Sequence, residues 1–389
     1  MIKTIKDIDV GQKRVLVRAD FNVPLDSGRV ADDTRIRACL PTVRYLVDHE
    51  ARVILCSHLG RPGGKVVEAL RLDPVARRLA ELLDQAVDKA DDCVGSEVRQ
   101  TVQALEPGQV LLLENTRFHP GEKANDPEFA AQLASLGEVY VDDAFGTAHR
   151  AHASTEGVAH DLPAVGGLLM EKELEVLGRV RENPAHPFVA ILGGAKISTK
   201  IDVMQRLLDQ VETLLVGGAM ANTFLLAQGR EVGESLVEED RLDTASQILD
   251  KGGDRLILPQ DVVIAREMEA DAERRTVSAN EVPAGWRILD VGPKTIERFE
   301  QEMEPARMVM WNGPLGAFEL KPFARATYAL ARALADLDAE TITGGGETAA
   351  AVNDVGVAER LTHVSTGGGA FLQFMEGKEL PGVAVLQKK

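Results

Sequence analysis

The sequence predicts an α/β protein built as two doubly wound, Rossmann-like lobes, each around a parallel sheet, joined by a helix. Three observations predict this fold. Short continuous apolar runs recur along the chain, segments of helical character separate them, and 389 residues exceed the length of one ordinary domain. Strands of a parallel sheet read as unbroken apolar runs because helices cover both of its faces. We therefore expect two such sheets.

Eight apolar runs are the expected strands, four in each half of the chain. They are residues 14–17, 52–55, 110–113, 139–141, 188–192, 213–216, 255–258 and 308–311. Between the two sets, residues 170–181 are charged but carry an apolar stripe at Leu174, Leu177 and Val180. Asn183-Pro184 follows, and the residue before a proline disfavours helix. This pattern predicts a connecting helix and a lobe boundary near residue 170.

Composition excludes several classes of partner. A net charge of −17 argues against nucleic acid or an anionic membrane. No run approaches the roughly 18 apolar residues of a membrane helix, and no apolar run follows the N-terminal lysines, so no secretory signal is expected. Cys39, Cys56 and Cys93 show no CxxC spacing and are interpreted as small buried residues in a reducing cytoplasm. A small anionic substrate remains possible.

Polar loops follow the four strands of the first lobe. Each contains one arginine: Arg18, Arg61, Arg117 or Arg150. Because the carboxyl ends of parallel strands meet at one edge of a sheet, these charges should converge and repel one another unless an anion balances them. The planar guanidinium suits phosphate and carboxylate. The first lobe is therefore predicted to bind a polyanion, and Asp20 and Asn22 add acceptors for a substrate hydroxyl.

Glycine-rich loops follow strands of the second lobe and precede helices. They are residues 193–200, 217–220, 344–348 and 366–369. Such loops offer free N–H groups and a favourable dipole to phosphate, and the first also holds Lys196 and Lys200. Residues 311–319 contain apolar atoms and glycines that could line a pocket for a flat base. Glu319, in the same segment, could accept hydrogen bonds from ribose hydroxyls. The second lobe is predicted to bind a nucleotide.

Several common motifs are absent from the sequence. It has no GxxxxGK[ST] loop, no GxGxxG followed by an acidic residue, and no HExxH or Cys/His cluster. A P-loop enzyme, a dinucleotide site and a zinc site are therefore not expected. His119, His149 and His152 are interpreted as anion contacts or structural residues rather than metal ligands.

The segment 14–24 resembles the signature of the phosphoglycerate kinase family. Further matches follow in the family's order over essentially the whole chain, at 57–62, 143–152, 193–196, 290–295, 311–319 and 365–369. The resemblance implies reversible, Mg²⁺-dependent phosphoryl transfer between 1,3-bisphosphoglycerate and ADP, giving 3-phosphoglycerate and ATP in glycolysis. It also implies a cytoplasmic monomer that closes about a hinge.

The resemblance assigns roles to individual residues. Catalytic roles fall to Arg35, Lys196 and Lys200. Substrate binding falls to Asp20, Asn22, Arg35, His58, Leu59, Gly60, Arg61, Arg117 and Arg150. Nucleotide binding falls to Lys200, Gly292, Asn312, Pro314, Glu319, Gly344, Gly345, Gly346, Glu347 and Thr348, with Glu347 also the Mg²⁺ contact.

The resemblance also divides the chain. Residues 1–169 form the 3-phosphoglycerate-binding lobe, 170–183 the interdomain helix and 184–370 the nucleotide-binding lobe. Residues 371–389 form a C-terminal segment that packs back on the first lobe.

The chain departs from the family pattern at three positions. Glu347 stands where the family has Asp, and Phe371 and Gln373 stand where it more usually has Ser and Glu. The longer Glu347 side chain moves the carboxylate by about an ångström, and Mg²⁺ is strict about geometry. A non-catalytic metabolite sensor is therefore one alternative. A nicotinamide-dependent dehydrogenase is the other, although the glycine fingerprint of that class is missing.

Overall fold

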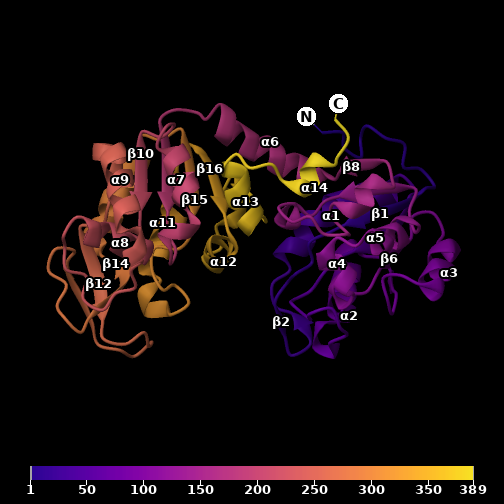
Figure 1. Ribbon diagram of the computed structural model, residues 1–389, viewed down its shortest axis with the longest axis horizontal. Coiled ribbons are helices and arrows are strands. Elements are labelled where there is room, and N and C mark those ends of the chain that lie inside the picture. The colour runs from indigo at the N-terminus through magenta and orange to yellow at the C-terminus, as the bar shows by residue number, and fades with distance from the viewer. Residues whose placement is uncertain (1, 389) are drawn as a thin grey trace. The chain divides into compact units, whose positions relative to one another are not determined.

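The computed structural model describes residues 2–388, which form two compact units (Figure 1). One unit comprises the chain up to Val176 together with the segment from Lys378 onward, and the other is Leu177–Gly377. The division falls within α6 (Leu168–Glu182), so the helix predicted at 170–181 is confirmed. None of the helices in residues 2–388 combines the length and apolar character needed to cross a bilayer.

The first unit contains a six-stranded parallel sheet with the order β5-β6-β4-β1-β7-β8. Its strands are β1 (Arg14–Arg18), β4 (Arg52–Cys56), β5 (Val87–Lys89), β6 (Val110–Leu112), β7 (Val139–Asp142) and β8 (Ala164–Gly166). The helices are α1 (Thr34–Asp48), α2 (Asp73–Leu83), α3 (Ser96–Ala104), α4 (Pro120–Ala124) and α5 (Pro127–Ala134). A short hairpin, β2 (Leu25–Asp26) and β3 (Arg29–Val30), precedes α1.

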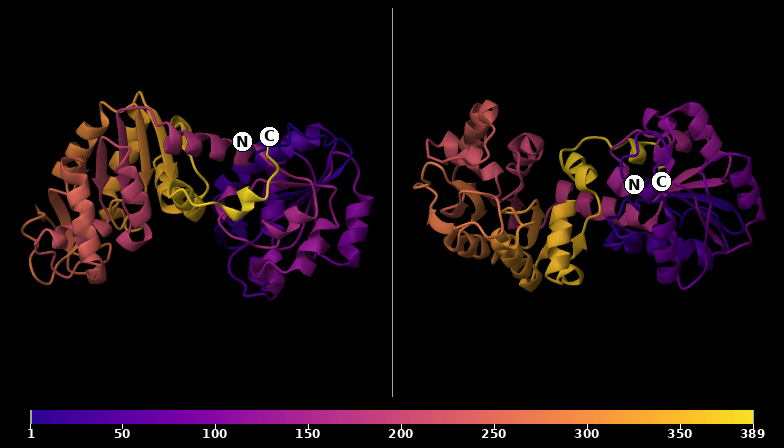
Figure 2. Two further views of the ribbon diagram at one scale, coloured as in Figure 1. Left: turned by 45° about the horizontal axis from the view of Figure 1, so that its top comes forward. Right: turned by 90° about the horizontal axis from the view of Figure 1, so that it is seen from below.

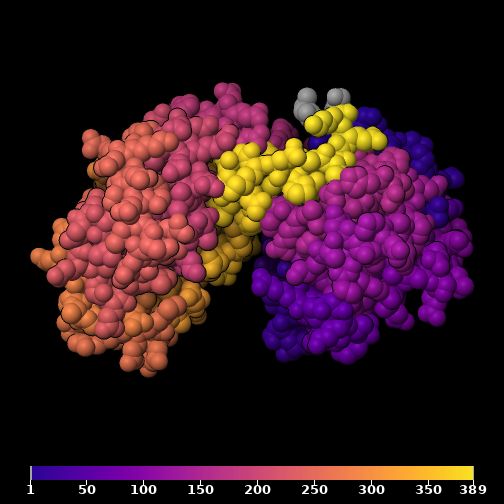
Figure 3. All heavy atoms as spheres, in the orientation of Figure 1, coloured from indigo at the N-terminus to yellow at the C-terminus, as the bar shows by residue number. Residues whose placement is uncertain are grey.

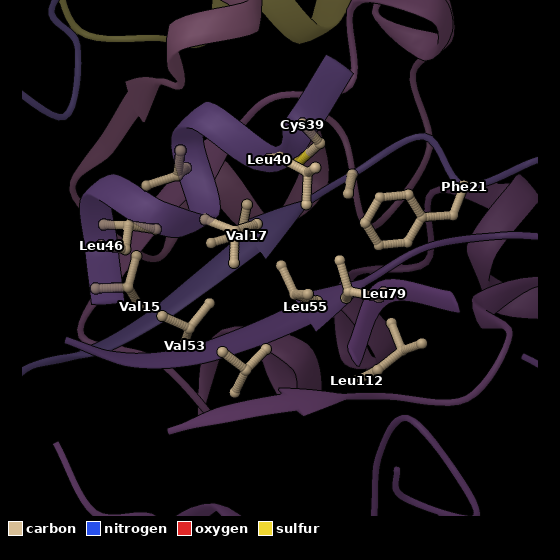
Figure 4. Close-up of a cluster of buried hydrophobic side chains, with 14 of the residues drawn as sticks. Val15, Val17, Phe21, Cys39, Leu40, Leu46, Val53, Leu55, Leu79 and Leu112 are labelled. Atoms are coloured by element: carbon tan, nitrogen blue, oxygen red, sulfur yellow. The ribbon is translucent and has the colours of Figure 1, made fainter. Parts of the chain in front are cut away.

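Both faces of this sheet are buried, which explains its unbroken apolar strands. Successive side chains of a strand point to opposite faces. Val15 and Val17 of β1 and Val53 of β4 pack in a core with residues of α1 and α2 (Figure 4). Leu16 and Ile54 alternate with them and are equally buried. A one-residue slip in register would exchange the two sets without exposing either, so neighbouring loops must help to fix the register.

Residues 378–388 belong to the first unit and run over its surface (Figure 3), whereas residues 371–377 of the predicted C-terminal segment belong to the second unit. It contains α14 (Pro381–Ala384). The Gly382 amide donates to the Ala148 carbonyl at 2.9 Å, and the Gln387 amide donates to the Ala164 carbonyl at 3.0 Å. The chain end is therefore anchored to the loop after β7 and to the edge strand β8.

The second unit repeats the architecture with a sheet of order β11-β10-β9-β15-β16-β17, and helices cover both of its faces (Figure 2). Its strands are β9 (Phe188–Leu192), β10 (Thr213–Val216), β11 (Leu256–Ile257), β15 (Met308–Asn312), β16 (Glu340–Gly344) and β17 (His363–Val364). The helices are α7 (Ile201–Leu207), α8 (Met220–Ala227), α9 (Leu242–Gly252), α10 (Pro293–Met303), α11 (Arg325–Asp336), α12 (Gly346–Asp354) and α13 (Gly368–Met375). All eight predicted strands are present, and the predicted α/β fold class is confirmed.

An antiparallel sheet in the second unit was not predicted. It has the order β13-β12-β14, formed by β13 (Arg274–Ser278), β12 (Asp261–Ala265) and β14 (Arg287–Val291). The edge strand β13 is largely exposed and begins with two arginines, so it lacks an apolar run. The guanidinium groups of Arg266 and Arg275 each contact the Trp286 ring, 5.0 and 4.5 Å from its centroid. A search for continuous apolar segments cannot find β13, whereas residues 262–265 of β12 form such a run and were missed.

Candidate active site

The four polar loops of the first unit follow four adjacent strands, β6, β4, β1 and β7. The strands are parallel, so their carboxyl ends share one edge of the sheet, as predicted. Asn115 ties two of these loops together: its side-chain Oδ1 accepts from the Leu59 amide at 3.2 Å and its Nδ2 donates to the Leu59 carbonyl at 2.8 Å. The predicted substrate residues therefore project from a rigid edge.

Four arginines impose a strong positive potential on this edge. Burial lowers the pKa of His58 well below its usual range, and the charges of Arg18, Arg117, Arg150 and Arg35 lower it further. Arg18 Nη2 lies 3.0 Å from His58 Nδ1, and a guanidinium can only donate. His58 Nδ1 must therefore be the acceptor, which leaves the proton of the neutral imidazole on Nε2 and makes that atom a hydrogen-bond donor.

A second histidine at this edge is also neutral at pH 7. Burial lowers the pKa of His152 to about 4, with further lowering by Arg117, Arg18 and Arg150. Neutral histidines add no charge to the site, so its positive potential comes from guanidinium groups that stay charged throughout the physiological range.

Arg117 carries donors that nothing in the described chain satisfies. Its Nη1 donates to the Gly60 carbonyl at 2.8 Å, but Nε and Nη2 are buried without a hydrogen-bond partner. Burial, followed by the charges of Arg150 and Arg18, lowers the pKa of Arg117 to about 10. Buried donors are nearly always paired, so an unpaired guanidinium is a strong indication of an absent anionic partner.

Hydrogen bonds connect most of the predicted substrate residues. Arg35 Nη1 donates to Asp20 Oδ2 at 2.9 Å and to the Asn22 carbonyl at 3.3 Å. Asn22 Oδ1 accepts from the Gly60 amide at 2.8 Å, and Gly60 is the residue that Arg117 contacts. The predicted cluster is thus brought together. Arg61 is exposed at its margin, and Arg150 is half-buried.

Arg18 differs from the other loop arginines. Its side chain is fully buried and donates to Ser154 Oγ at 2.8 Å as well as to the Ala19 carbonyl. Ser154 Oγ in turn donates to Glu122 Oε1 at 2.6 Å, which provides a buried counter-charge. Arg18 is therefore a structural residue that raises the local potential without facing solvent.

In the second unit, most of the predicted loops contribute to the wall of a cavity of about 380 Å³, but the loop at residues 366–369 does not. Pro314, Glu319 and Glu347 line it, together with glycines of the first two glycine loops. The backbones of these loops bond directly to one another, the Gly194 amide to the Pro314 carbonyl at 2.7 Å and the Gly218 amide to the Leu315 carbonyl at 3.0 Å. A Cβ at Gly218 would lie 2.5 Å from the Gly194 nitrogen, so glycine is required there.

Lys200 is a buried cation beside this cavity. Its Nζ donates to the carbonyls of Gly193 at 2.6 Å and Asn312 at 2.9 Å. Burial lowers the pKa of Lys200 to about 7, although the Glu347 carboxylate opposes the shift. The helix expected directly after the loop begins at Ile201, because residues Ile197–Thr199 first form a 3₁₀ turn, η5. Lys196, before that turn, is exposed.

The third glycine loop is held by side chains that were also predicted. Asn312 Nδ2 donates to the Gly344 carbonyl at 2.7 Å, and Thr348 Oγ1 accepts from the Gly313 amide at 2.7 Å. Gly345, with φ of +101°, precedes α12, whose first turn contains Gly346 and Glu347. The first amides of a helix lack intrahelical partners, so this turn presents N–H donors beside the exposed Glu347 carboxylate.

Phe371, one of the departures from the family pattern, is fully buried against this loop. A Cβ at Gly344 would lie 2.5 Å from Phe371 Cδ2 and Cε2. The ring therefore occupies the space that a side chain at position 344 would need. Through this ring, α13 packs against the third glycine loop.

The sequence analysis missed some cavity residues. Several predicted nucleotide residues do not line the cavity, namely Lys200, Gly292, Asn312, Gly344, Gly345, Gly346 and Thr348. Asp290 and Arg287, on the unpredicted β14, line the cavity, as do Leu236 and Met268. Burial raises the pKa of Asp290 to about 7. In the sequence, the resemblance to the family at residues 290–295 was the one indication of a functional role for Asp290. Gly292 is not among the lining residues, because it packs at the start of α10, where a Cβ would lie 2.3 Å from Asp261 Oδ2.

Two α/β units, one with a cationic edge and the other with a glycine-lined cavity, define a two-domain kinase, an enzyme that transfers phosphoryl groups. Comparisons with known proteins specify the family. The family model described as phosphoglycerate kinase matches residues 5–378. The chain is 59% identical to the phosphoglycerate kinase of Moorella thermoacetica, over 99% of both chains. It is 58% identical to that of Chloroflexus aurantiacus, over 99% of this chain and 98% of the relative.

Solved structures agree with the sequence comparisons. The phosphoglycerate kinase of Coxiella burnetii is 42% identical, with a TM-score of 0.85, and that of Pyrococcus horikoshii is 33% identical, with a TM-score of 0.90. Each comparison covers 99% of this chain and 98% of the other. The chain belongs to the phosphoglycerate kinase family, and the resemblance found in the sequence is confirmed.

Proposed function

We propose that the protein catalyses reversible, Mg²⁺-dependent phosphoryl transfer between 1,3-bisphosphoglycerate and ADP, giving 3-phosphoglycerate and ATP. The observation that carries this proposal is the pair of unpartnered, buried guanidinium nitrogens of Arg117 at an edge where four arginines act together. A substrate with both a phosphate and a carboxylate is the kind of anion that would satisfy them. The curated relatives carry the name of this reaction's enzyme.

On the acceptor side, Arg117 and Arg150 supply charge for the substrate phosphate, and His58 Nε2 supplies a neutral donor. Asp20 and Asn22 add acceptors for the hydroxyl, and Asp20 also holds Arg35 at 2.9 Å. Leu59, Gly60 and Arg61 complete the loop. Arg35 is anchored at one nitrogen while its side chain stays 29% exposed, so the rest of the guanidinium is free to meet the transferred phosphoryl group.

On the donor side, the cavity beside Pro314 and Glu319 would hold the nucleoside. The first turn of α12 and Lys200 would face its phosphates. Glu347 fits Mg²⁺: it is an exposed carboxylate on the cavity wall, and Mg²⁺ in such sites takes one or two carboxylates, phosphate oxygens and waters. When bound, Mg²⁺ would neutralise phosphate charge.

The chemistry requires no general base. The carboxylate of 3-phosphoglycerate is already ionised at pH 7, and the lowered pKa values of His58 and His152 make both of them weak bases. Transfer then depends on alignment and on stabilising charge that spreads over the phosphoryl oxygens. Arg35, Lys196 and Lys200 would supply that stabilisation, each worth about 10²–10³ in rate by analogy with a single oxyanion donor.

The decisive experiment measures turnover of Mg-ATP with 3-phosphoglycerate by the wild-type protein and by Glu347→Asp. We expect robust wild-type turnover, with kcat of Glu347→Asp within about tenfold, because both side chains offer carboxylate oxygens to the metal. Glu300→Asp, an exposed position on α10, is the matched control.

The sensor alternative rests on Glu347. ADP binding without turnover in the wild type would support that alternative, and restored turnover in Glu347→Asp would show that only the metal contact had been detuned. Absence of both turnover and ADP binding would refute the kinase proposal itself.

Lys200 makes nucleotide binding dependent on pH. Burial disfavours its charged form in the free protein, whereas bound phosphate favours it, so binding above pH 7 must take up a proton. Affinity for ADP should fall between pH 7.5 and 9 by up to about tenfold per unit. Calorimetry in buffers of different ionisation enthalpy would measure the uptake. Lys200→Met should abolish it, Lys251→Met should retain it, and a pH-independent wild-type affinity would contradict the assignment.

We also propose that the protein acts as a cytoplasmic monomer, as the family resemblance implies. The buried, unpaired thiols of Cys39, Cys56 and Cys93 support a reducing compartment.

A further inference from the structure

A cluster of three possible metal ligands lies in the first unit, and the proposed function does not use it. Asp92 and Cys93 belong to the loop between β5 and α3, and His119 lies between η2 (Thr116–Phe118) and α4. One ligand atom from each lies within 4.8 Å of the other two. Within residues 2–388, no other group of His, Cys and carboxylate side chains meets this criterion.

Local contacts orient two of the three ligands. Asp92 Oδ1 lies 2.6 Å from His119 Nε2 and accepts from the Cys93 amide at 2.6 Å. The His119 ring stacks on Phe129 with 5.0 Å between centroids and 23° between planes. The imidazole and the carboxylate are therefore held together in one place. Cys93 is fully buried and forms the floor of the cluster, while Asp92 is exposed and His119 is 30% exposed, which leaves a path from solvent.

We propose that Asp92, Cys93 and His119 bind one Zn²⁺ ion, with water as the fourth ligand. Thiolate, imidazole and carboxylate together suit Zn²⁺, whereas Mg²⁺ and Ca²⁺ prefer oxygen ligands. Zinc–ligand bonds of about 2.0–2.3 Å place ligand atoms roughly 3.3–3.8 Å apart in a tetrahedron. The cluster reaches this arrangement when the Asp92–His119 hydrogen bond opens and the ion takes the place of its proton.

Binding has a defined chemical balance. Zn²⁺ displaces the proton of the Cys93 thiol to solvent. The proton that His119 Nε2 donates to Asp92 also leaves that nitrogen, so that neutral imidazole, protonated on Nδ1, binds the ion through Nε2. The bound ion would tie the loop after β5 to the segment that carries Arg117, two residues before His119. Because the ion binds the folded protein, it should raise the melting temperature.

The test uses Co²⁺ as a spectroscopic probe on the metal-free, nucleotide-free protein. We expect one equivalent of Co²⁺ to produce the charge-transfer absorption of a cobalt–thiolate bond, and Zn²⁺ to displace it. The Glu347 site proposed for Mg²⁺ has no cysteine in its lining and gives no such band. Cys93→Ser should abolish the band, and His119→Gln should weaken Co²⁺ binding by at least about tenfold, the range seen when metal-site partners are removed.

The matched control is His160→Gln. His160 pairs with Glu156 in the same unit, but no thiol lies close enough to that pair to complete a group of three ligands. The loss of His160 should therefore change neither the band nor the Co²⁺ affinity. If Cys93→Ser fails to fold, His119→Gln and Asp92→Asn decide the question, because both positions are at least partly exposed. A wild-type protein without the band, or a His119→Gln variant with unchanged affinity, would overturn the proposal.

Discussion

Replacing Arg35 with alanine is expected to lower kcat by about 10²–10³-fold, the loss typical of one transition-state donor. Arg35 lies in the first turn of α1 at the cationic edge, and its anchored nitrogen donates to Asp20 at 2.9 Å. The fold should survive, because the side chain is 29% exposed and forms no part of the apolar core. Steady-state kinetics with Mg-ATP and 3-phosphoglycerate, beside a melting curve, would measure both effects.

Arg37→Ala is the natural control for this experiment. Arg37 lies on the same helix, is exposed, and forms an ion pair with Asp33 at 2.8 Å. The Arg37→Ala substitution removes an equal charge two positions away from Arg35, so a general electrostatic effect on kcat would appear in both variants. Near-normal kcat in Arg35→Ala, or an equal fall in Arg37→Ala, would show that Arg35 has no specific role in transfer.

Replacing Arg117 with methionine should separate function from stability. The variant is expected to lose about 10²–10³-fold in kcat/KM for 3-phosphoglycerate, because removing one partner of a buried charge pair costs about 2–5 kcal/mol. Its melting temperature should nevertheless stay level or rise. In the free protein the guanidinium is buried with two unpartnered nitrogens, and an apolar side chain of similar length avoids that desolvation.

Arg99→Met, at an exposed position on α3, controls for loss of a positive charge from the first unit. It should leave kcat/KM unchanged. A large fall in the melting temperature of Arg117→Met would indicate that the residue is structural, as Arg18 is. Unchanged kcat/KM would remove Arg117 from the proposed site.

The fold was largely predictable because both faces of each main sheet are covered. Burial on both faces makes strands such as Phe188–Leu192 continuous apolar runs, which single-sequence patterns report well. The same topology places the loops that follow such strands at a common edge, so the clustering of Arg117 with the loop at Gly60 followed from the parallel direction of the predicted strands.

Other features depend on tertiary context that no local pattern carries. β13 is an exposed edge strand that begins with two arginines, so its hydrophobic pattern does not distinguish it from a loop. Arg18 looked like the other loop arginines, and only the burial of Ser154 and Glu122 beside it makes it structural. The cluster of Asp92, Cys93 and His119 joins residues 27 positions apart, at a spacing that matches no metal-binding motif.

The contact between Phe371 and Gly344 makes the residues allowed at these two positions depend on each other. With a phenyl ring 2.5 Å from where its Cβ would stand, position 344 is closed to every residue that has a side chain. A smaller residue at 371 would reopen that space. A side chain at position 344 would therefore be tolerated only together with a smaller residue at 371.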